Sequence, residues 1–182
     1  MTRRARIAIG VGVLAALQIG AVLIYLLVQG SRASSPSTRF AVERPSITEV
    51  APSINARRSD GSAVAITWPA HRTRIVHFWA TWCAPCVKEL PGLLAFGRDM
   101  RERGFEVVAI AVDDDWKDIA TFFGGTIPPE VIVESNGAAH KRFGVSTLPD
   151  TYLVNPAGKV VERYYGARDW RAPAARAHFS SR

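Results

Sequence analysis

Two kinds of hydrophobic pattern alternate along the chain from about residue 47 to its end. Short, nearly continuous apolar runs are typical of buried strands, whereas apolar residues spaced three and four apart are typical of helices. We expect strands at 74–79, 105–112, 130–134, 151–155 and 159–164. We expect helices at 86–103, from the aspartates at 113–115 to about 123, at 138–143 and at 169–179.

Two turn signals predict hairpins near the ends of this pattern. Residues 59–62 (Ser-Asp-Gly-Ser) separate two short extended segments, and residues 155–158 (Asn-Pro-Ala-Gly) separate the last two predicted strands. Strands joined by helices pair in parallel, whereas strands joined by short turns pair antiparallel. The predicted fold class is therefore α/β, with a mixed central sheet flanked by helices.

The first 46 residues differ in composition from the rest of the chain. Residues 7–28 contain no charged side chain, and as a helix they would span roughly 33 Å, enough for a hydrocarbon core of about 30 Å. Residues 1–6 carry three arginines, which the positive-inside rule assigns to the cytoplasm. Residues 29–46 have the composition of a linker. We therefore predict a single-pass anchor in the inner membrane, with a domain at 47–182 in the periplasm or its extracytoplasmic equivalent.

A cleaved signal peptide is the alternative interpretation of the same segment. Residues 31–33 (Ser-Arg-Ala) have the small-x-small pattern of a cleavage site. The apolar region of a signal peptide usually has about 7–15 residues, and the longer run here favours an uncleaved anchor. Both interpretations put the domain outside the cytoplasm.

The net charge of +7 comes mainly from the N-terminal region. Five of the 23 basic residues precede the first acidic residue, Glu43, which leaves 18 basic residues against 16 acidic ones. The sequence has no basic stripe with interleaved aromatic residues, so we do not expect nucleic acid as a partner.

The chain has only two cysteines, Cys83 and Cys86. Two are too few for a disulfide scaffold or a four-cysteine zinc site, and a c-type haem site would need histidine in place of Val87. The pair follows a predicted strand and opens a predicted helix, where the helix dipole lowers the pKa of a thiol. We predict a redox-active disulfide that needs no metal or other cofactor. Cys83 would be the nucleophile, and Cys86 would resolve the mixed disulfide.

An inert structural disulfide, or a pair of buried thiols, is the alternative for these cysteines. The strand-to-helix position favours a redox pair, as do the flanking residues Trp79, Trp82 and Pro85. Pro85 fits the first helical turn, where its missing N–H is not needed. A second feature is Leu148-Pro149, just before a predicted strand, where the X-Pro bond is either cis or, as is commoner, trans.

Residues 78–91 resemble the active-site segment of thioredoxin-like proteins, in particular the membrane-anchored TlpA/ResA/CcmG group. Residues 143–158 resemble the cis-proline segment of that group, and the whole similarity covers about 48–166. The resemblance implies a thioredoxin fold with an N-terminal β-hairpin and a helical insert after residue 113. It also implies an exposed Cys83, a resolving Cys86 and a cis Pro149, beside which the substrate binds as an added strand.

Some positions depart from the pattern of the group. His77 stands where many thioredoxins carry a buried aspartate, and it is either a proton carrier for Cys86 or a core histidine. Ala84 stands where some ResA-like members have an acid between the cysteines. Asp150, next to the proline, either replaces that acid or is a turn residue.

The resemblance implies a reductase of disulfides in exported proteins, supplied with electrons by a membrane protein. Its substrates would be apocytochrome c before haem attachment, or the copper-site cysteines of an oxidase assembly factor. One alternative is a copper(I)-binding module formed by the two thiols, with or without His77, since soft thiolates favour copper(I). Another is a thiol peroxidase, for which Thr81 has a suitable spacing but the second cysteine is atypical.

Overall fold

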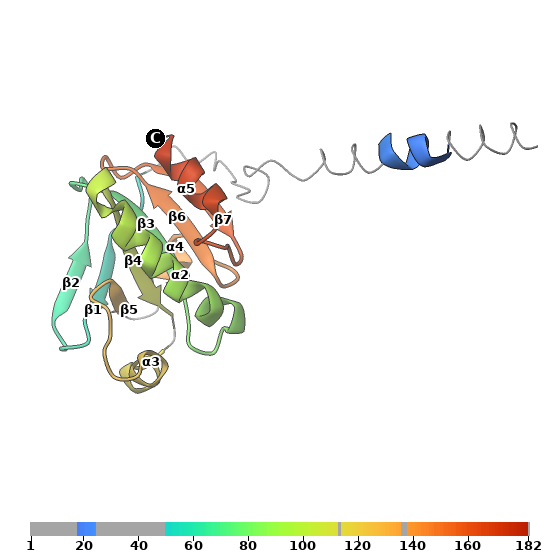
Figure 1. Cartoon of the computed structure of the whole chain (residues 1–182). Coiled ribbons are helices and arrows are strands. Elements are labelled where there is room, and N and C mark those ends of the chain that lie inside the picture. The colour runs from blue at the N-terminus through green and yellow to red at the C-terminus, as the bar shows by residue number, and fades with distance from the viewer. Residues whose placement is uncertain (1–17, 25–49, 113, 136–137, 182) are drawn as a thin grey trace, which may run out of the picture. The chain divides into compact units, whose positions relative to one another are not determined.

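The structure of the protein, a computed structural model, describes residues 18–24, 50–112, 114–135 and 138–181 (Figure 1). The chain divides into two units, at 1–39 and 40–182, and the first contributes a helix at 18–24. Within the described ranges, no helix has the length and apolar character needed to span a membrane. Most of the predicted anchor, the basic flank before it and the linker after it lie outside these ranges.

A seven-stranded mixed sheet forms the centre of the second unit, in the order β2-β1-β5-β4-β3-β6-β7. Strands β3, β4 and β5 are parallel, whereas β1–β2 and β6–β7 are antiparallel hairpins. The strands are β1 (Ile54–Arg57), β2 (Ala63–Ile66), β3 (Thr73–Trp79), β4 (Phe105–Ala111), β5 (Val131–Glu134), β6 (Asp150–Val154) and β7 (Val160–Tyr165). The helices are α2 (Ala84–Met100), the short 3-10 helix η2 (Arg101–Arg103), α3 (Trp116–Phe123), α4 (Ala139–Arg142) and α5 (Pro173–Ser180). The predicted α/β class and mixed sheet are confirmed.

The N-terminal hairpin and the helical insert that the resemblance implied are both present. In the turn between β1 and β2, the Arg58 N–H donates to the Ser62 carbonyl at 2.9 Å. The insert is α3, which begins after Asp115 because the Asp115 carboxylate caps it by accepting the Asp118 N–H at 2.9 Å.

Helices α2 and α5 begin at residues other than those predicted, for reasons that the structure shows. Helix α2 begins at Ala84 rather than at Cys86, because Pro85 occupies the first turn, where no N–H is required. Helix α5 begins at Pro173 rather than near residue 169, because the Ala172 N–H donates to the Asp169 carbonyl and closes a turn before the helix. This turn forms part of a groove beside α2.

Helices cover the two faces of the sheet, and each face has its own core (Figure 1). Because strand side chains alternate between faces, Ile75 and Trp79 of β3 pack with α2, α3 and α5. Val76 and Phe78 of the same strand pack on the other face with α4. The two cores hold the end of β3 and the start of α2 in place. Residues 80–83, called the cysteine loop below, join these two elements.

Candidate active site

Cys83 and Cys86 form a disulfide at the N-terminus of α2, with their Cα atoms 5.2 Å apart. Cys83 is the N-cap of the helix and has an extended backbone, and its carbonyl accepts the Val87 N–H at 3.1 Å. Cys83 is 6% exposed, whereas Cys86 has no exposed surface. The resemblance implied an exposed Cys83. Cys83 is the more accessible of the two cysteines, but in the disulfide form it is buried, because the protein covers most of both residues.

The first turn of α2 favours a negative charge on Cys83 in the reduced protein. The free N–H groups at a helix N-terminus carry a partial positive charge. The first turn of α2 contains no acidic side chain, and no side chain caps the helix by a hydrogen bond. A thiolate on Cys83 would therefore occupy the position of the missing acceptor, which makes this sulfur the better nucleophile.

Asp114 holds the loop between β3 and Cys83, and sequence reasoning did not identify it. Its carboxylate accepts both the backbone N–H and the hydroxyl of Thr81, each at 2.6 Å. The Val112 N–H donates to the Trp79 carbonyl at 2.9 Å, so the end of β4 is bonded to the same loop at a second point. These bonds join the cysteine loop to the insert, and they use the Thr81 hydroxyl that the peroxidase alternative would need.

The two tryptophans near the disulfide have different surroundings. Trp79 is fully buried and packs on Phe122 and Phe123 of α3, with ring centroids 5.6 and 6.1 Å away. Trp82, the residue before Cys83, is 65% exposed. Trp79 therefore anchors the loop in the core, whereas Trp82 and the exposed Pro85 offer contact surface beside the disulfide.

The Leu148–Pro149 peptide bond is cis, as the resemblance implied. Pro149 is buried, and its carbonyl accepts the Gly166 N–H at 2.9 Å, while Leu148 is half-buried. Strand β6 runs antiparallel to β3 with Asp150 opposite Phe78. Pro149 is therefore level with the end of β3 from which the cysteine loop starts, and the fold brings the two sequence motifs to one edge of the sheet.

His77 is fully buried in β3, on the face of the sheet that α2 covers. Its Nδ1 shares a hydrogen bond of 2.9 Å with the Thr151 hydroxyl of β6, and its Nε2 lies 3.6 Å from Glu89 Oε1. Burial lowers the pKa of His77 to about 3, so the imidazole is neutral near pH 7. The contact with Glu89 is therefore not an ion pair at that pH.

Glu89 is the second acid of the site that sequence reasoning missed. It lies three residues after Cys86 on α2, and its Oε2 accepts the Arg168 N–H from the segment after β7. Burial raises its pKa to about 7, against the opposing effect of the Arg168 hydrogen bond. An acid one helical turn after the inner cysteine, among apolar residues, was the available signal. Of the two side chains that face each other here, Glu89 rather than His77 exchanges a proton near neutral pH.

Asp150 lies away from this pair. Its carboxylate accepts hydrogen bonds from Arg163, at 3.1 Å from Nε, and from the Tyr152 hydroxyl, also at 3.1 Å. Burial raises the pKa of Asp150, although Arg163 opposes this effect. Asp150 and Tyr152 alternate along β6 with Thr151, the partner of His77, so they face the opposite side of the sheet. The structure thus unites His77 with Glu89 and Thr151, and Asp150 with Arg163.

Residues 47–163, more than half of the chain, match the sequence model of the AhpC/TSA family. The chain belongs to the AhpC/TSA family. The match spans β1 to β7 without its last two residues, and it includes both cysteines and Pro149. The predicted resemblance to thioredoxin-like proteins is therefore confirmed.

Named relatives of this AhpC/TSA-family protein are thiol-disulfide oxidoreductases. The protein ResA of Bacillus subtilis is 30% identical over 115 residues, which cover 62% of this chain and 63% of ResA. ResA of Bacillus anthracis is 28% identical over 127 residues, which cover 68% of this chain and 72% of that protein. The first of these alignments thus spans slightly less than two thirds of the relative.

Solved structures share the fold at lower identity. A thiol:disulfide interchange protein from Chlorobium tepidum has a TM-score of 0.60 at 22% identity, covering 74% of this chain and 97% of that protein. StoA from Bacillus subtilis has a TM-score of 0.56 at 22% identity, covering 69% and 96%. These likenesses show that the AhpC/TSA-family domain has a thioredoxin-like fold.

Possible metal ligands do not gather in the part of the chain that the structure describes. No group of three or more His, Cys, Asp or Glu side chains there is placed to hold a metal ion. His77 points to Glu89 and Thr151.

Proposed function

We propose that the protein is an extracytoplasmic thiol-disulfide oxidoreductase that reduces disulfides in exported proteins. The observation that carries the proposal is the Cys83–Cys86 disulfide at a helix N-terminus, at the same edge of the sheet as cis Pro149. Similarity to proteins named ResA supports the chemistry. The apolar, charge-free segment at 7–28 supports a membrane-anchored location.

The exchange begins with the reduced protein. The Cys83 thiolate attacks one sulfur of a substrate disulfide, a mixed disulfide forms, and the other substrate sulfur leaves as a thiolate that takes up a proton. The Cys86 thiol then transfers its proton to the Glu89 carboxylate and attacks Cys83 Sγ. The second substrate sulfur leaves as a thiolate that takes up a proton, Glu89 returns its proton to solvent, and Cys83–Cys86 becomes the disulfide. Two electrons have then moved to the substrate.

Recharging the pair requires a dithiol donor. In the proposed location this is a membrane protein whose own two cysteines become a disulfide as Cys83–Cys86 is reduced. Exported proteins with cysteine pairs are the proposed substrates, with cytochrome c maturation and copper-site assembly as the settings that the resemblance suggests. No separate cofactor enters any step, because the cysteine sulfurs carry both electrons.

Substrate trapping tests the proposed chemistry. In the Cys86→Ser variant, Cys83 can form the mixed disulfide but nothing resolves it, so we expect covalent complexes on a non-reducing gel that disappear with dithiothreitol. The Cys83→Ser variant is the matched control and should capture nothing. A folded Cys86→Ser protein that captures no partner in the cell of origin would refute the exchange mechanism.

The redox direction has a separate test. Equilibration of the Cys83–Cys86 pair with glutathione or dithiothreitol buffers gives its reduction potential. A reductase should have a potential nearer to that of thioredoxin, about −270 mV, than to that of DsbA, about −120 mV. A potential near the DsbA value would mean that the protein forms disulfides rather than reduces them.

A further inference from the structure

A groove lies beside the disulfide, between the first two turns of α2 and the segment that joins β7 to α5. Its volume is about 580 Å³. Helix α2 lines it with Pro85, Lys88, Glu89 and Gly92, and the connecting segment lines it with residues 167–171. Residues at these spacings share one face of a helix. Because Pro85 lies between the two cysteines in sequence, one end of the groove is the redox motif itself.

The walls of this groove are mainly cationic. Lys88, Arg168 and Arg171 line it, against the exposed carboxylate of Asp169. Lys88 and Arg171 are both exposed, and within the described ranges neither forms an ion pair with an acidic residue. Glu89 adds at most part of a negative charge near pH 7, because burial raises its pKa to about 7. The groove therefore offers positive charge that the protein itself does not neutralise.

The connecting segment is bonded to α2, so the backbone at Arg168 and Arg171 has a defined position beside the helix. The Glu89 carboxylate accepts the Arg168 N–H, and the Asp169 carboxylate accepts the Arg171 N–H at 3.1 Å. The Arg171 side chain lies over Gly92, where an added Cβ would be 3.4 Å from its Cγ. The aliphatic part of Arg171 thus crosses the helix where Gly92 leaves room for it.

We propose that this groove binds an acidic, extended segment of the protein partner that exchanges disulfides with Cys83–Cys86. The inference rests on the proposed function and names the chemistry of its partner. From Pro85 to Gly92 the helix rises roughly 10 Å, the length of about three extended residues. Carboxylates on those residues would pair with Lys88 and Arg171. Such charges accelerate encounter and fix the register of the partner beside the reactive sulfur.

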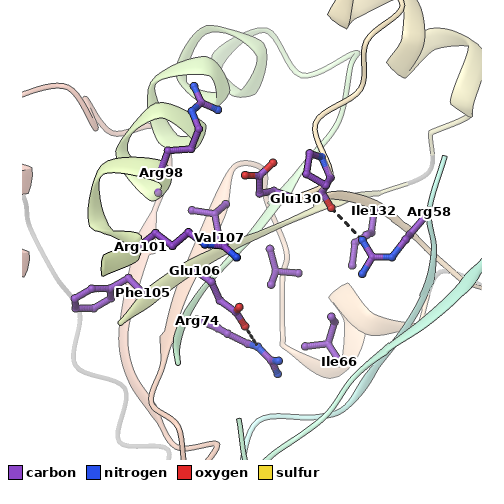
Figure 2. Close-up of a pocket in the computed structure, with 13 residues that line it drawn as sticks. Arg58, Ile66, Arg74, Arg98, Arg101, Phe105, Glu106, Val107, Glu130 and Ile132 are labelled. Carbon is purple, nitrogen blue, oxygen red and sulfur yellow. Dashed lines mark hydrogen bonds and ion pairs between the residues drawn. The ribbon is translucent and has the colours of Figure 1, made fainter. Parts of the chain in front are cut away.

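A second hollow at the other end of α2 also contains arginines and provides a control (Figure 2). Its volume is about 280 Å³, and two of its cations are already engaged. Arg74 pairs with Glu106, and Arg58 donates to the Pro129 carbonyl. Arg98 of α2 and Arg101 of η2 line the same hollow, and Arg98 lies roughly 18 Å along α2 from Cys86. Reversing these two charges changes the net charge as much as reversing Lys88 and Arg171, but far from the disulfide.

The experiment measures kcat/KM for three disulfide peptides that differ only in a tripeptide next to one cysteine. The tripeptide is Asp-Asp-Asp, Asn-Asn-Asn or Lys-Lys-Lys. At low salt we expect the wild-type protein to prefer the acidic peptide over the neutral one by about tenfold, with a smaller preference at 1 M salt, where the Debye length is about 3 Å. Each variant is judged by its ratio of kcat/KM between two peptides. A change in the reactivity of its own Cys83 and Cys86 cancels in that ratio.

The double variant Lys88→Glu/Arg171→Glu should lose this preference and react faster with the lysine peptide than the wild-type protein does. This gain cannot result from unfolding. The Arg98→Glu/Arg101→Glu variant should keep the wild-type preference. Equal rates of the wild-type protein with all three peptides would overturn the groove assignment and leave the exchange chemistry intact. A wild-type protein that reduces none of the peptides would instead contradict the proposed function.

Discussion

Glu89 connects the buried region behind the disulfide to the groove at the surface. One carboxylate oxygen faces His77 Nε2 at 3.6 Å, and the other accepts the Arg168 N–H of the groove wall. The Glu89 side chain follows Cys86 by one helical turn. Because burial raises its pKa to about 7, this carboxyl can both accept and release a proton at the pH of thiol exchange.

We predict that Glu89→Gln slows the resolving step, because glutamine cannot take the proton of Cys86. The rate of peptide disulfide reduction should fall by on the order of 10²-fold, the lower range for loss of a general base. In the wild-type protein the rate should rise with pH around 7 as Glu89 ionises, and this rise should be absent in the variant. Rates measured from pH 5 to 9 check both effects.

Glu106→Gln is the control for this prediction. Glu106 pairs with Arg74 at the hollow far from the disulfide, so its loss should leave the pH profile unchanged. An unchanged profile in Glu89→Gln would show that Cys86 loses its proton by another route.

Helix α2 approaches the sheet closely near its C-terminal end, at Gly97 of the helix and Val107 of β4. A Cβ added at Gly97 would lie 2.4 Å from Val107 Cγ2, closer than real Cβ atoms come to other atoms, and 3.2 Å from Val107 Cβ, which is a tight contact. Valine has one rotatable side-chain bond, so it cannot move aside easily. Glycine at this position therefore allows α2 to lie against β4 and to present its N-terminus at the end of β3.

We predict that Gly97→Ala lowers the free energy of unfolding by about 1–3 kcal/mol, the usual effect of overpacking a core. Val107→Ala removes the clashing methyl group, so the double variant should recover part of the loss contributed by the clash. Urea denaturation of the wild type, both single variants and the double variant gives this coupling energy. Strictly additive effects would show that the contact does not limit the approach of helix and strand.

The helices and strands were largely predictable from the sequence, because the spacing of apolar residues and the residue types that favour turns are local properties. The strand at 74–79 and the hairpin turn at 155–158 were expected from such signals and are present. The contacts that complete the site are not local. Glu89 meets Arg168, and Thr81 meets Asp114, across long separations in sequence. No local pattern encodes these pairings. The position of Glu89 one helical turn after Cys86 was a local signal, but the acid near the cysteines was sought at Asp150 instead.

At the scale of the whole molecule, His77 and Glu89 affect stability in opposite ways as pH changes. Burial lowers the pKa of His77 from 6.5 to about 3, so its contribution to stability is lost as pH falls below 6.5. Burial raises the pKa of Glu89 from 4.5 to about 7, so its contribution is lost as pH rises from 4.5 through 7. Between pH 4.5 and 6.5 the unfolded chain holds its proton on His77 and the folded protein holds one on Glu89. The two contributions then cancel.

Single substitutions should therefore reveal a pH dependence of the free energy of unfolding that cancels in the wild-type protein. In Glu89→Gln only His77 remains, and the free energy of unfolding should rise with pH from 4.5 to 6.5, by up to about 1.4 kcal/mol per pH unit relative to wild type. In His77→Asn only Glu89 remains, and the slope should have the opposite sign. Urea denaturation of the oxidised proteins across this range measures both slopes. A general loss of packing would lower the free energy of unfolding equally at every pH and would produce no slope. If the slopes of the two variants relative to wild type had the same sign, the assignment of one proton to each residue would be wrong.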